Sequence, residues 1–193
     1  SDSNLPHYLL LPEIHEVLNA IKEMDTHFLV NTLWHTGTKI SETLSLTKES
    51  FHIDGVRNSK LVLTATKQRK RGRPASKDKA KPDRSVPIID PIYLDEIERY
   101  LATRKPKKDE LLFQMSRQAI DNRLKKIMAD LDLPIDSLST QTFRHSFAIH
   151  SLFLGRSVKT VQEWLGHRNV AEMEIYTRIL SDDPHHLMYG MIF

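Results

Sequence analysis

Four residues in the second half of the chain carry side chains that phosphoryl-transfer chemistry can use. Arg144 and His145 are adjacent, His167 follows Gly166, and Tyr176 comes nine residues after His167. A Tyr hydroxyl can attack a phosphodiester and hold one end of the cut strand as a phosphotyrosine. An Arg can bind phosphate oxygens through two N–H donors, and a His can hydrogen-bond the same phosphate or move a proton. Each residue alone is a weak signal, but the set in this order and spacing predicts a phosphodiester-cleaving site.

Three segments that contain these residues resemble the tyrosine recombinases, the phage-integrase-like family. They are Thr36-Gly37-Thr38-Lys39-Ile40-Ser41-Glu42, Phe143-Arg144-His145-Ser146-Phe147-Ala148, and Leu165-Gly166-His167 followed by Tyr176. The family carries Thr-Gly-Leu-Arg-Ile-Ser-Glu, a segment like His-x-Leu-Arg-His-Thr-Phe-Ala, and Leu-Gly-His with a Tyr nine residues after its His. The resemblance runs from about Leu11 to Tyr176, and its motifs are specific in combination although weak singly.

The resemblance implies catalytic positions for six residues, which are Tyr176, Arg144, His167, Lys67, Lys39 and Gln141. Tyr176 would be the nucleophile, and Arg144 and His167 would bind the scissile phosphate. Lys67 ends a predicted strand, where the family has its mobile active-site Lys, and would protonate the departing 5′ oxygen. Close rivals for the part of Lys67 are Arg69, Lys70 and Arg71.

Two of these positions depart from the family's residues. Lys39 stands where the family has Arg, and a Lys ammonium cannot present the planar pair of donors of a guanidinium. Gln141 stands where the family has His, three residues before Arg144, and Gln can hydrogen-bond a phosphate but cannot shuttle a proton. Loss of a transition-state donor can slow a reaction by about 100-fold to 1,000-fold. The sequence therefore predicts a recombinase of reduced activity, one with a rearranged site, or a DNA-binding relative that no longer cuts.

Each of these residues also has a plain structural alternative. Tyr176 could pack on a helix face, Arg144 could pair with a carboxylate, and His167 could cap the carbonyls at a helix end. For His145 a structural hydrogen bond and a catalytic one stay equally open. We assign six residues to DNA binding: Arg69, Lys70, Arg71, Arg73, His145 and Arg168.

The composition is that of a soluble globular protein whose 193 residues suit one domain with a real core. No apolar run approaches membrane-spanning length, and no signal peptide opens the chain, so we expect no membrane contact. The absence of Cys excludes disulfides and thiolate metal sites, and fits a cytoplasmic protein that associates with the nucleoid in a prokaryote. Because transesterification conserves bond energy, no metal or cofactor is implied.

The basic residues are unevenly distributed, although the net charge of +3 is too small to name nucleic acid as the partner. Lys and Arg far outnumber acidic residues over 67–83, which we expect to be a basic, flexible loop. This loop is either a solvated hairpin tip or an arm that contacts DNA phosphates and gains affinity by counterion release.

Apolar spacing predicts a mainly helical fold with a small antiparallel sheet, and the resemblance implies the catalytic-domain fold of DNA breaking-rejoining enzymes. Helices are predicted from Pro12, over 26–36, from Ser41 to Leu46, over 91–103, from Ser116 to Leu131, from Ser139 or Thr140 to Gly155, from Ser157 to Leu165, and from Glu172 to Leu180. Strands are predicted over 51–56, 60–66 and 84–89, the first two about a turn at 55–59.

We expect residues 1–193 to form a single catalytic domain with a leader over 1–11 and a tail over 184–193. The family's N-terminal DNA-clamping domain is expected to be absent, because nothing before Leu11 is long enough to form one. The tail is rich in large apolar side chains, which are Leu187, Met188, Tyr189, Met191, Ile192 and Phe193. It docks either on its own domain or on a neighbouring protomer.

The resemblance implies the catalytic domain of a site-specific recombinase or integrase that cuts and rejoins DNA through a 3′-phosphotyrosine. Its partners would be double-stranded DNA and further copies of the chain, assembling on DNA as a dimer to tetramer. Two alternatives stay open: a catalytically weakened, recombinase-like DNA-binding protein, and an enzyme like the type IB topoisomerases, which uses similar chemistry to relax supercoils.

Overall fold

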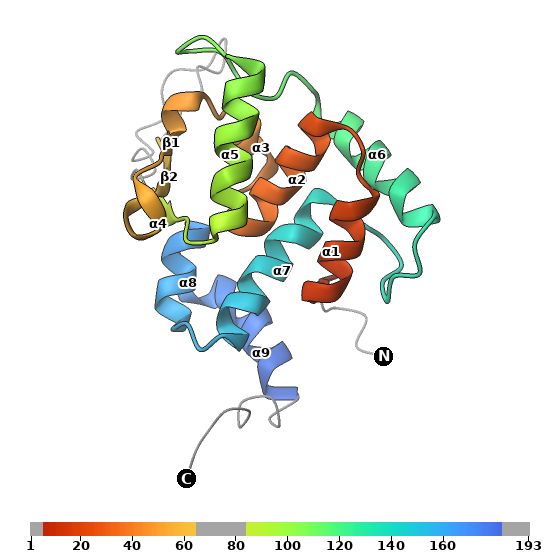
Figure 1. Ribbon diagram of the computed structural model, residues 1–193. Coiled ribbons are helices and arrows are strands. Elements are labelled where there is room, and N and C mark those ends of the chain that lie inside the picture. Colours follow the sequence, from red (N-terminus) through yellow and green to blue (C-terminus); the bar gives the residue numbers. More distant parts are fainter. Residues whose placement is uncertain (1–5, 65–83, 183–193) are drawn as a thin grey trace, which may run out of the picture.

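The computed structural model describes residues 6–64 and 84–182, and shows the predicted combination of many helices with one small sheet (Figure 1). In chain order the elements are α1 (Leu11–Ala20), α2 (Met24–Thr36), α3 (Ile40–Thr43), η1 (Lys48–Ser50), β1 (Phe51–His52), α4 (Gly55–Asn58), β2 (Lys60–Leu63), β3 (Arg84–Pro87), α5 (Pro91–Arg104), α6 (Arg117–Ala129), α7 (Thr140–Phe153), α8 (Val158–Leu165), η2 (Val170–Met173) and α9 (Glu174–Asp182). Here η marks a 3₁₀ turn.

Local capping signals correctly predict several of the helix ends. Ser116 begins α6 by accepting a hydrogen bond from the Ala119 amide, and Ser157 begins α8 in the same way. Gly37 and Gly166 end α2 and α8 in the left-handed conformation, with φ of 60° and 66°. Each of these signals depends on a few neighbouring residues, so it can be recognised from the sequence alone.

The sheet has the order β1-β2-β3 with antiparallel neighbours, but β1 is much shorter than predicted. The predicted strand over 51–56 is wrong beyond His52, because the chain turns into the single helical turn α4. The Ser59 hydroxyl closes this turn by accepting from the Asp54 amide (2.9 Å) and donating to the Gly55 carbonyl (2.6 Å). Val56 is left exposed on the turn instead of pairing in the sheet.

Several other predicted boundaries are wrong by a few residues, including the start of α2 at Met24 and the end of α6 at Ala129. The strand β3 ends at Pro87, and Ile89 beyond it is 65% exposed. The helix α3 ends at Thr43, because the amides of Ser45 and Leu46 bond to carbonyls only three residues back. The helix α9 begins at Glu174, after a 3₁₀ turn that Asn169 caps through the Ala171 amide.

The core consists of two clusters that share α7. In the first cluster α2 is the central helix, packed between α5 and α7, with Phe28 stacked on Tyr100 at 4.0 Å between ring centroids (Figure 1). The second cluster joins α7, α8 and α9, and Tyr176 is one of its buried members. Phe143 of α7 lies in the first cluster and Ala148 in the second. The helix that carries Arg144 and His145 is therefore fixed from both sides.

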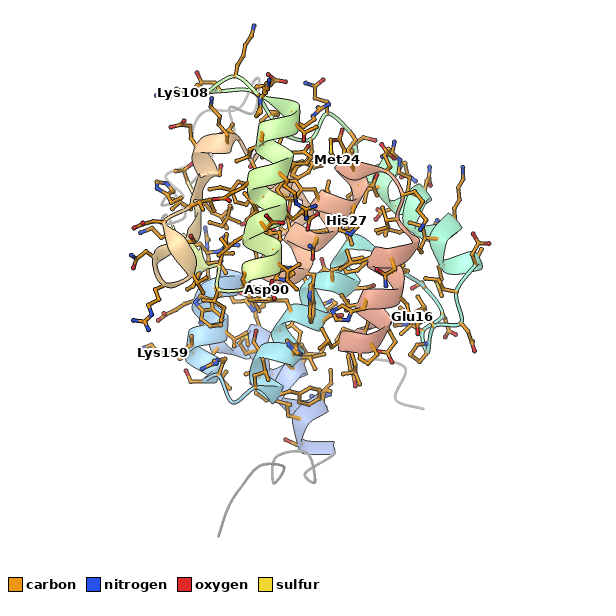
Figure 2. All side chains as sticks on the ribbon, viewed as in Figure 1. Glu16, Met24, His27, Asp90, Lys108 and Lys159 are labelled. Carbon is orange, nitrogen blue, oxygen red and sulfur yellow. The ribbon has the colours of Figure 1, made fainter. Side chains whose placement is uncertain are left out.

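A broad groove of 1340 Å³ opens between α1 and α5, over α2, α7 and α8. Figure 2 shows this face, with His27 and Asp90 labelled on the lining of the groove. None of the catalytic or DNA-binding residues predicted from the sequence lines it among the residues that the structure describes. Over 6–64 and 84–182, no helix is long and apolar enough to cross a membrane.

Candidate active site

Arg144 lies in the second turn of α7 and is 2% exposed. Its guanidinium donates to the carbonyl oxygen of Gly37 and to that of Leu165 (2.8 Å). These carbonyls end α2 and α8, where helix C-termini carry partial negative charge. The two bonds use two of the five N–H donors of the guanidinium, so further donors can meet an anion. The structural alternative for Arg144 was an ion pair with a carboxylate. Among the described residues, its guanidinium instead donates to these two carbonyls.

Gly37 permits this close approach for two reasons. Its left-handed backbone is strained for other residues, and a Cβ at this position would overlap the ring of Phe147 and lie 2.9 Å from Leu165. The ends of α2 and α8 therefore pack directly against α7, and their carbonyls reach Arg144.

Tyr176 and His145 are joined by a hydrogen bond between α9 and α7. The Tyr176 hydroxyl lies 2.9 Å from Nδ1 of His145, and Tyr176 is 2% exposed. Burial lowers the pKa of His145 to about 4, and the charge of Arg144 and the nearby His167 act in the same direction. His145 is therefore neutral at pH 7, and its Nδ1 accepts from the hydroxyl when the ring proton is on Nε2. Burial also raises the pKa of Tyr176, although the charge of Arg144 opposes this.

The ring of His167 lies parallel to the ring of Tyr176. Its ring lies 6.3 Å from that of Tyr176, with 6° between the planes. Its Nδ1 is 3.3 Å from Sδ of Met173, and its Nε2 is 3.8 Å from Glu172. The backbone amide of His167 does cap α8 by donating to the Gln162 carbonyl (3.1 Å), but the ring makes its contacts elsewhere. Burial and the charge of Arg144 lower its pKa to about 4. An anion bound here would offset these positive charges and favour protonation.

Lys39 lies at the start of α3 and is partly buried. Its backbone amide donates to Oε2 of Glu42 (2.8 Å), and its charge contributes to the lowered pKa of His167. The first segment of the resemblance is thus brought close to the third.

Arg84 and Glu42 form an ion pair that the sequence did not predict. The two terminal nitrogens of Arg84 donate to the two carboxylate oxygens of Glu42, each at 2.7 Å, and its Nε donates to the Trp164 carbonyl at 2.9 Å. A Cβ on Gly166 would lie 2.8 Å from the guanidinium. Burial alone would raise the pKa of Glu42, but Arg84 and the Lys39 amide outweigh it and lower the pKa. The signals in the sequence were a Glu inside the first matched segment and an Arg where β3 begins.

Two further predicted residues lie at the surface. Gln141 is exposed on α7 one turn before His145, and both line a small hollow of 180 Å³. Arg168 is exposed just after His167. The remaining predicted residues lie outside the described ranges, and these are Lys67, Arg69, Lys70, Arg71 and Arg73. Over the described residues, no group of three or more His, Cys, Asp or Glu could hold a metal ion.

Together these contacts place a buried hydroxyl beside a neutral imidazole, a second imidazole and a buried guanidinium. The charges of Lys39 and Arg84 also reach His167. The arrangement offers a nucleophile, a proton acceptor and several positive charges for a phosphodiester.

Comparisons with known proteins agree with this chemistry. The profile of the phage integrase family matches residues 8–182. A probable site-specific recombinase in the afa region of Escherichia coli is 37% identical over 182 residues, which cover 92% of this chain and 72% of that protein. A resolvase from Escherichia coli is 29% identical, over 97% of this chain and 80% of its own length. The tyrosine recombinase XerD of Pasteurella multocida is 27% identical, and the chain spans 62% of its length.

Solved structures show the same fold at lower identity. The XerA recombinase superimposes with a TM-score of 0.75 at 20% identity, over 98% of this chain and 67% of that one. The catalytic domain of bacteriophage HP1 integrase gives a TM-score of 0.60 at 24% identity, over 94% of this chain and 90% of its own. The XerH recombinase bound to its palindromic difH substrate gives 0.73 at 21%, over 97% and 54%. From the profile match and the 37%-identical relative, the chain belongs to the phage integrase family of tyrosine recombinases.

Proposed function

We propose that this chain cuts and rejoins duplex DNA in site-specific recombination, with Tyr176 as the nucleophile and a 3′-phosphotyrosine as the intermediate. One observation carries the proposal. The Tyr176 hydroxyl is buried at 2.9 Å from the His145 imidazole, in the same cluster as the guanidinium of Arg144 and the ring of His167. A tyrosine that only filled the core would not need three such groups around it.

In the proposed reaction, the Tyr176 oxygen attacks the scissile phosphorus and the bond to the 5′ oxygen breaks. Arg144, His167 and Lys39 stabilise the charge on the phosphate oxygens in the transition state. Lys67 gives the departing 5′ oxygen its proton, as the family resemblance suggests. A 5′ hydroxyl from a partner strand then attacks the phosphotyrosine, which restores a phosphodiester and frees Tyr176.

We further propose that the basic segment and Arg168 hold the DNA by its phosphates. The segment connects β2 to β3. Arg84, the first residue of β3, donates to the Trp164 carbonyl at the end of α8. Arg84, which pairs with Leu63 across the two strands, therefore lies beside the proposed active site. The related XerH recombinase and Tn1549 transposon integrase have been solved with DNA. Copies of the chain would assemble on paired sites in the cytoplasm, and the tail, which lies outside the described residues, would dock in cis or in trans.

A suicide-substrate assay tests the cutting step. Duplex DNA nicked next to the cleavage site traps the covalent product, because the short cut strand diffuses away and cannot rejoin. The parent chain should form a protein–DNA adduct on a denaturing gel, and Tyr176→Phe should form none while its DNA affinity stays within a few-fold. Tyr189→Phe is the matched control and should leave the adduct intact.

The outcomes separate the candidate functions. Loss of the adduct in Tyr189→Phe with retention in Tyr176→Phe would contradict the assignment of the nucleophile. DNA binding without any adduct from the parent would make the chain a DNA-binding relative. An adduct accompanied by relaxation of supercoiled plasmid, without strand exchange between sites, would indicate a topoisomerase-like enzyme.

A further inference from the structure

We propose that His145 is the general base that takes the proton from Tyr176, in place of the His that this chain lacks at position 141. The assignment rests on the proposed function and names the group that activates its nucleophile. Nδ1 of His145 lies 2.9 Å from the Tyr176 hydroxyl, within the range in which a base can accept a proton directly.

The geometry of α7 explains how one residue can replace the other. Gln141 and His145 are four residues apart on this helix, so they lie on the same face one turn apart. Both line the same 180 Å³ hollow. The Gln141 amide has no nitrogen that can accept a proton at ordinary pH. The imidazole one turn further along does have one, and it already contacts the reacting oxygen.

The neighbouring groups hold His145 in the form that a base requires. Arg144 precedes it on α7, His167 faces Tyr176 from the segment after α8, and His7 lies across the hollow. Burial and the positive charge of Arg144 favour the neutral imidazole, so Nδ1 is available before DNA binds. A phosphate that binds beside Arg144 and His167 would offset this charge and make His145 a stronger base. The base would thus gain strength only when the substrate is in place.

The proposed step balances as follows. The Tyr176 oxygen forms its bond to phosphorus while its proton passes to Nδ1 of His145, which becomes an imidazolium. The bond between phosphorus and the 5′ oxygen breaks, and that oxygen takes its proton from the general acid of the proposed function. In the second half of the reaction, the attacking 5′ hydroxyl gives its proton to the deprotonated general acid as its oxygen bonds to phosphorus. The bond between phosphorus and the Tyr176 oxygen breaks, and the imidazolium returns its proton to that oxygen.

The first experiment compares His145→Gln with the parent in the suicide-substrate assay. Removal of a general base should slow adduct formation by about 100-fold to 10,000-fold, with DNA affinity within a few-fold of the parent. His150→Gln is the matched control, because His150 lies on the same helix, is partly buried and contacts Trp34 away from Tyr176. This control should cleave at close to the parental rate.

The second experiment separates proton transfer from a purely structural role. Incorporation of 3-fluorotyrosine at position 176 lowers the pKa of the nucleophile, so the reaction depends less on a base. It should restore at least 10-fold of the rate lost in His145→Gln, and the further change Gln141→His should also recover activity. A hydrogen bond that only orients Tyr176 would not be replaced by a more acidic phenol.

The pH profile gives a third readout. The base must be neutral, so the parent should lose cleavage as pH falls through the pKa of His145, which is about 4 without DNA and higher with a phosphate bound. His145→Gln should lack this acidic limb. Parental cleavage by His145→Gln would overturn the assignment of the base and leave the proposed function intact. Loss without rescue by fluorotyrosine or by Gln141→His would also overturn it, whereas no adduct from the parent would refute the proposed function itself.

Discussion

Lys39 is one of the two residues at which the proposed phosphate site departs from the family pattern. It is partly buried, its backbone amide donates to Glu42, and it stands in the position where the family has an Arg. A guanidinium can hold two phosphate oxygens at once, and an ammonium acts as a single point charge. The effect of this difference on the rate of adduct formation can be measured with one substitution.

We expect Lys39→Arg to raise the rate of adduct formation by about 10-fold or more, because a charge-assisted hydrogen bond contributes about 1.5–3 kcal/mol. The rate would be measured with the nicked duplex under single-turnover conditions. Lys159→Arg, on the exposed face of α8, is the control for a general effect of arginine (Figure 2). An unchanged or lower rate would mean that the pocket is adapted to Lys39, for instance because a new Arg competes with Arg84 for Glu42.

At the scale of elements, the Arg84–Glu42 pair connects three segments that surround the site. Arg84 belongs to β3, Glu42 to α3, and the Trp164 carbonyl to the end of α8, which leads into His167. The side chains of Arg84 and Glu42 are only 15% and 20% exposed. Removal of one member leaves the other charge largely buried without compensation, which is far more costly than loss of a surface pair.

We expect Arg84→Gln to lower the free energy of unfolding by about 3–5 kcal/mol at pH 7. Urea denaturation measures this change, and Arg99→Gln, which breaks the exposed pair with Asp95, should cost no more than about 1 kcal/mol. The pH dependence has a defined sign. The folded-state pKa of Glu42 is lowered, so its stabilisation is present above the unfolded-state pKa and is lost as pH falls through the folded value.

That loss of stability in acid should be smaller in Arg84→Gln, because burial opposes the ionised form of Glu42 and Arg84 no longer offsets it. Adduct formation should also slow in the folded fraction, since Lys39 and His167 lose their common anchor. If Arg84→Gln were no more destabilising than Arg99→Gln, the pair would not hold these elements together.

At the scale of the whole molecule, affinity for DNA depends on how the basic residues are distributed. The basic segment over 67–83 is anchored at Leu63 and Arg84, which pair across β2 and β3 next to the proposed site. DNA phosphates bound by this segment would thus lie close to the proposed active site. The net charge of the whole chain is only +3, so the distribution of charge matters more than its total.

Replacement of Arg69, Lys70, Arg71 and Arg73 by Gln should weaken DNA binding and flatten the slope of log affinity against log salt. The slope should change by roughly 0.9 for each DNA phosphate that the variant no longer neutralises. Fluorescence anisotropy over a range of salt concentrations measures it. A control with the same loss of charge replaces Lys22, Arg99, Lys125 and Lys159 by Gln, and should leave the slope closer to that of the parent. Equal slopes in the two variants would show that the segment acts only through net charge.

Local sequence signals were sufficient for the long helices and for the family. The ends of α2, α6 and α8 follow from Gly37, Ser116, Ser157 and Gly166, because a cap is formed by residues a few positions apart. The spacing from His167 to Tyr176 carried the resemblance, which the family profile confirms. Short elements were poorly predicted, because β1, α4 and the 3₁₀ turn before α9 depend on contacts that extend beyond their own few residues.

The pairing of side chains across the site could not be predicted from spacing. Tyr176 meets His145, 31 positions away in sequence, and Arg84 meets Glu42 at a separation of 42. Arg144 binds the Gly37 carbonyl across 107 positions. These contacts exist only because α2, α8 and α9 pack against α7, and the free energy of burying their apolar faces selects that arrangement. Sequence motifs identify the candidate residues, and tertiary packing determines which of them lie within hydrogen-bond distance of one another.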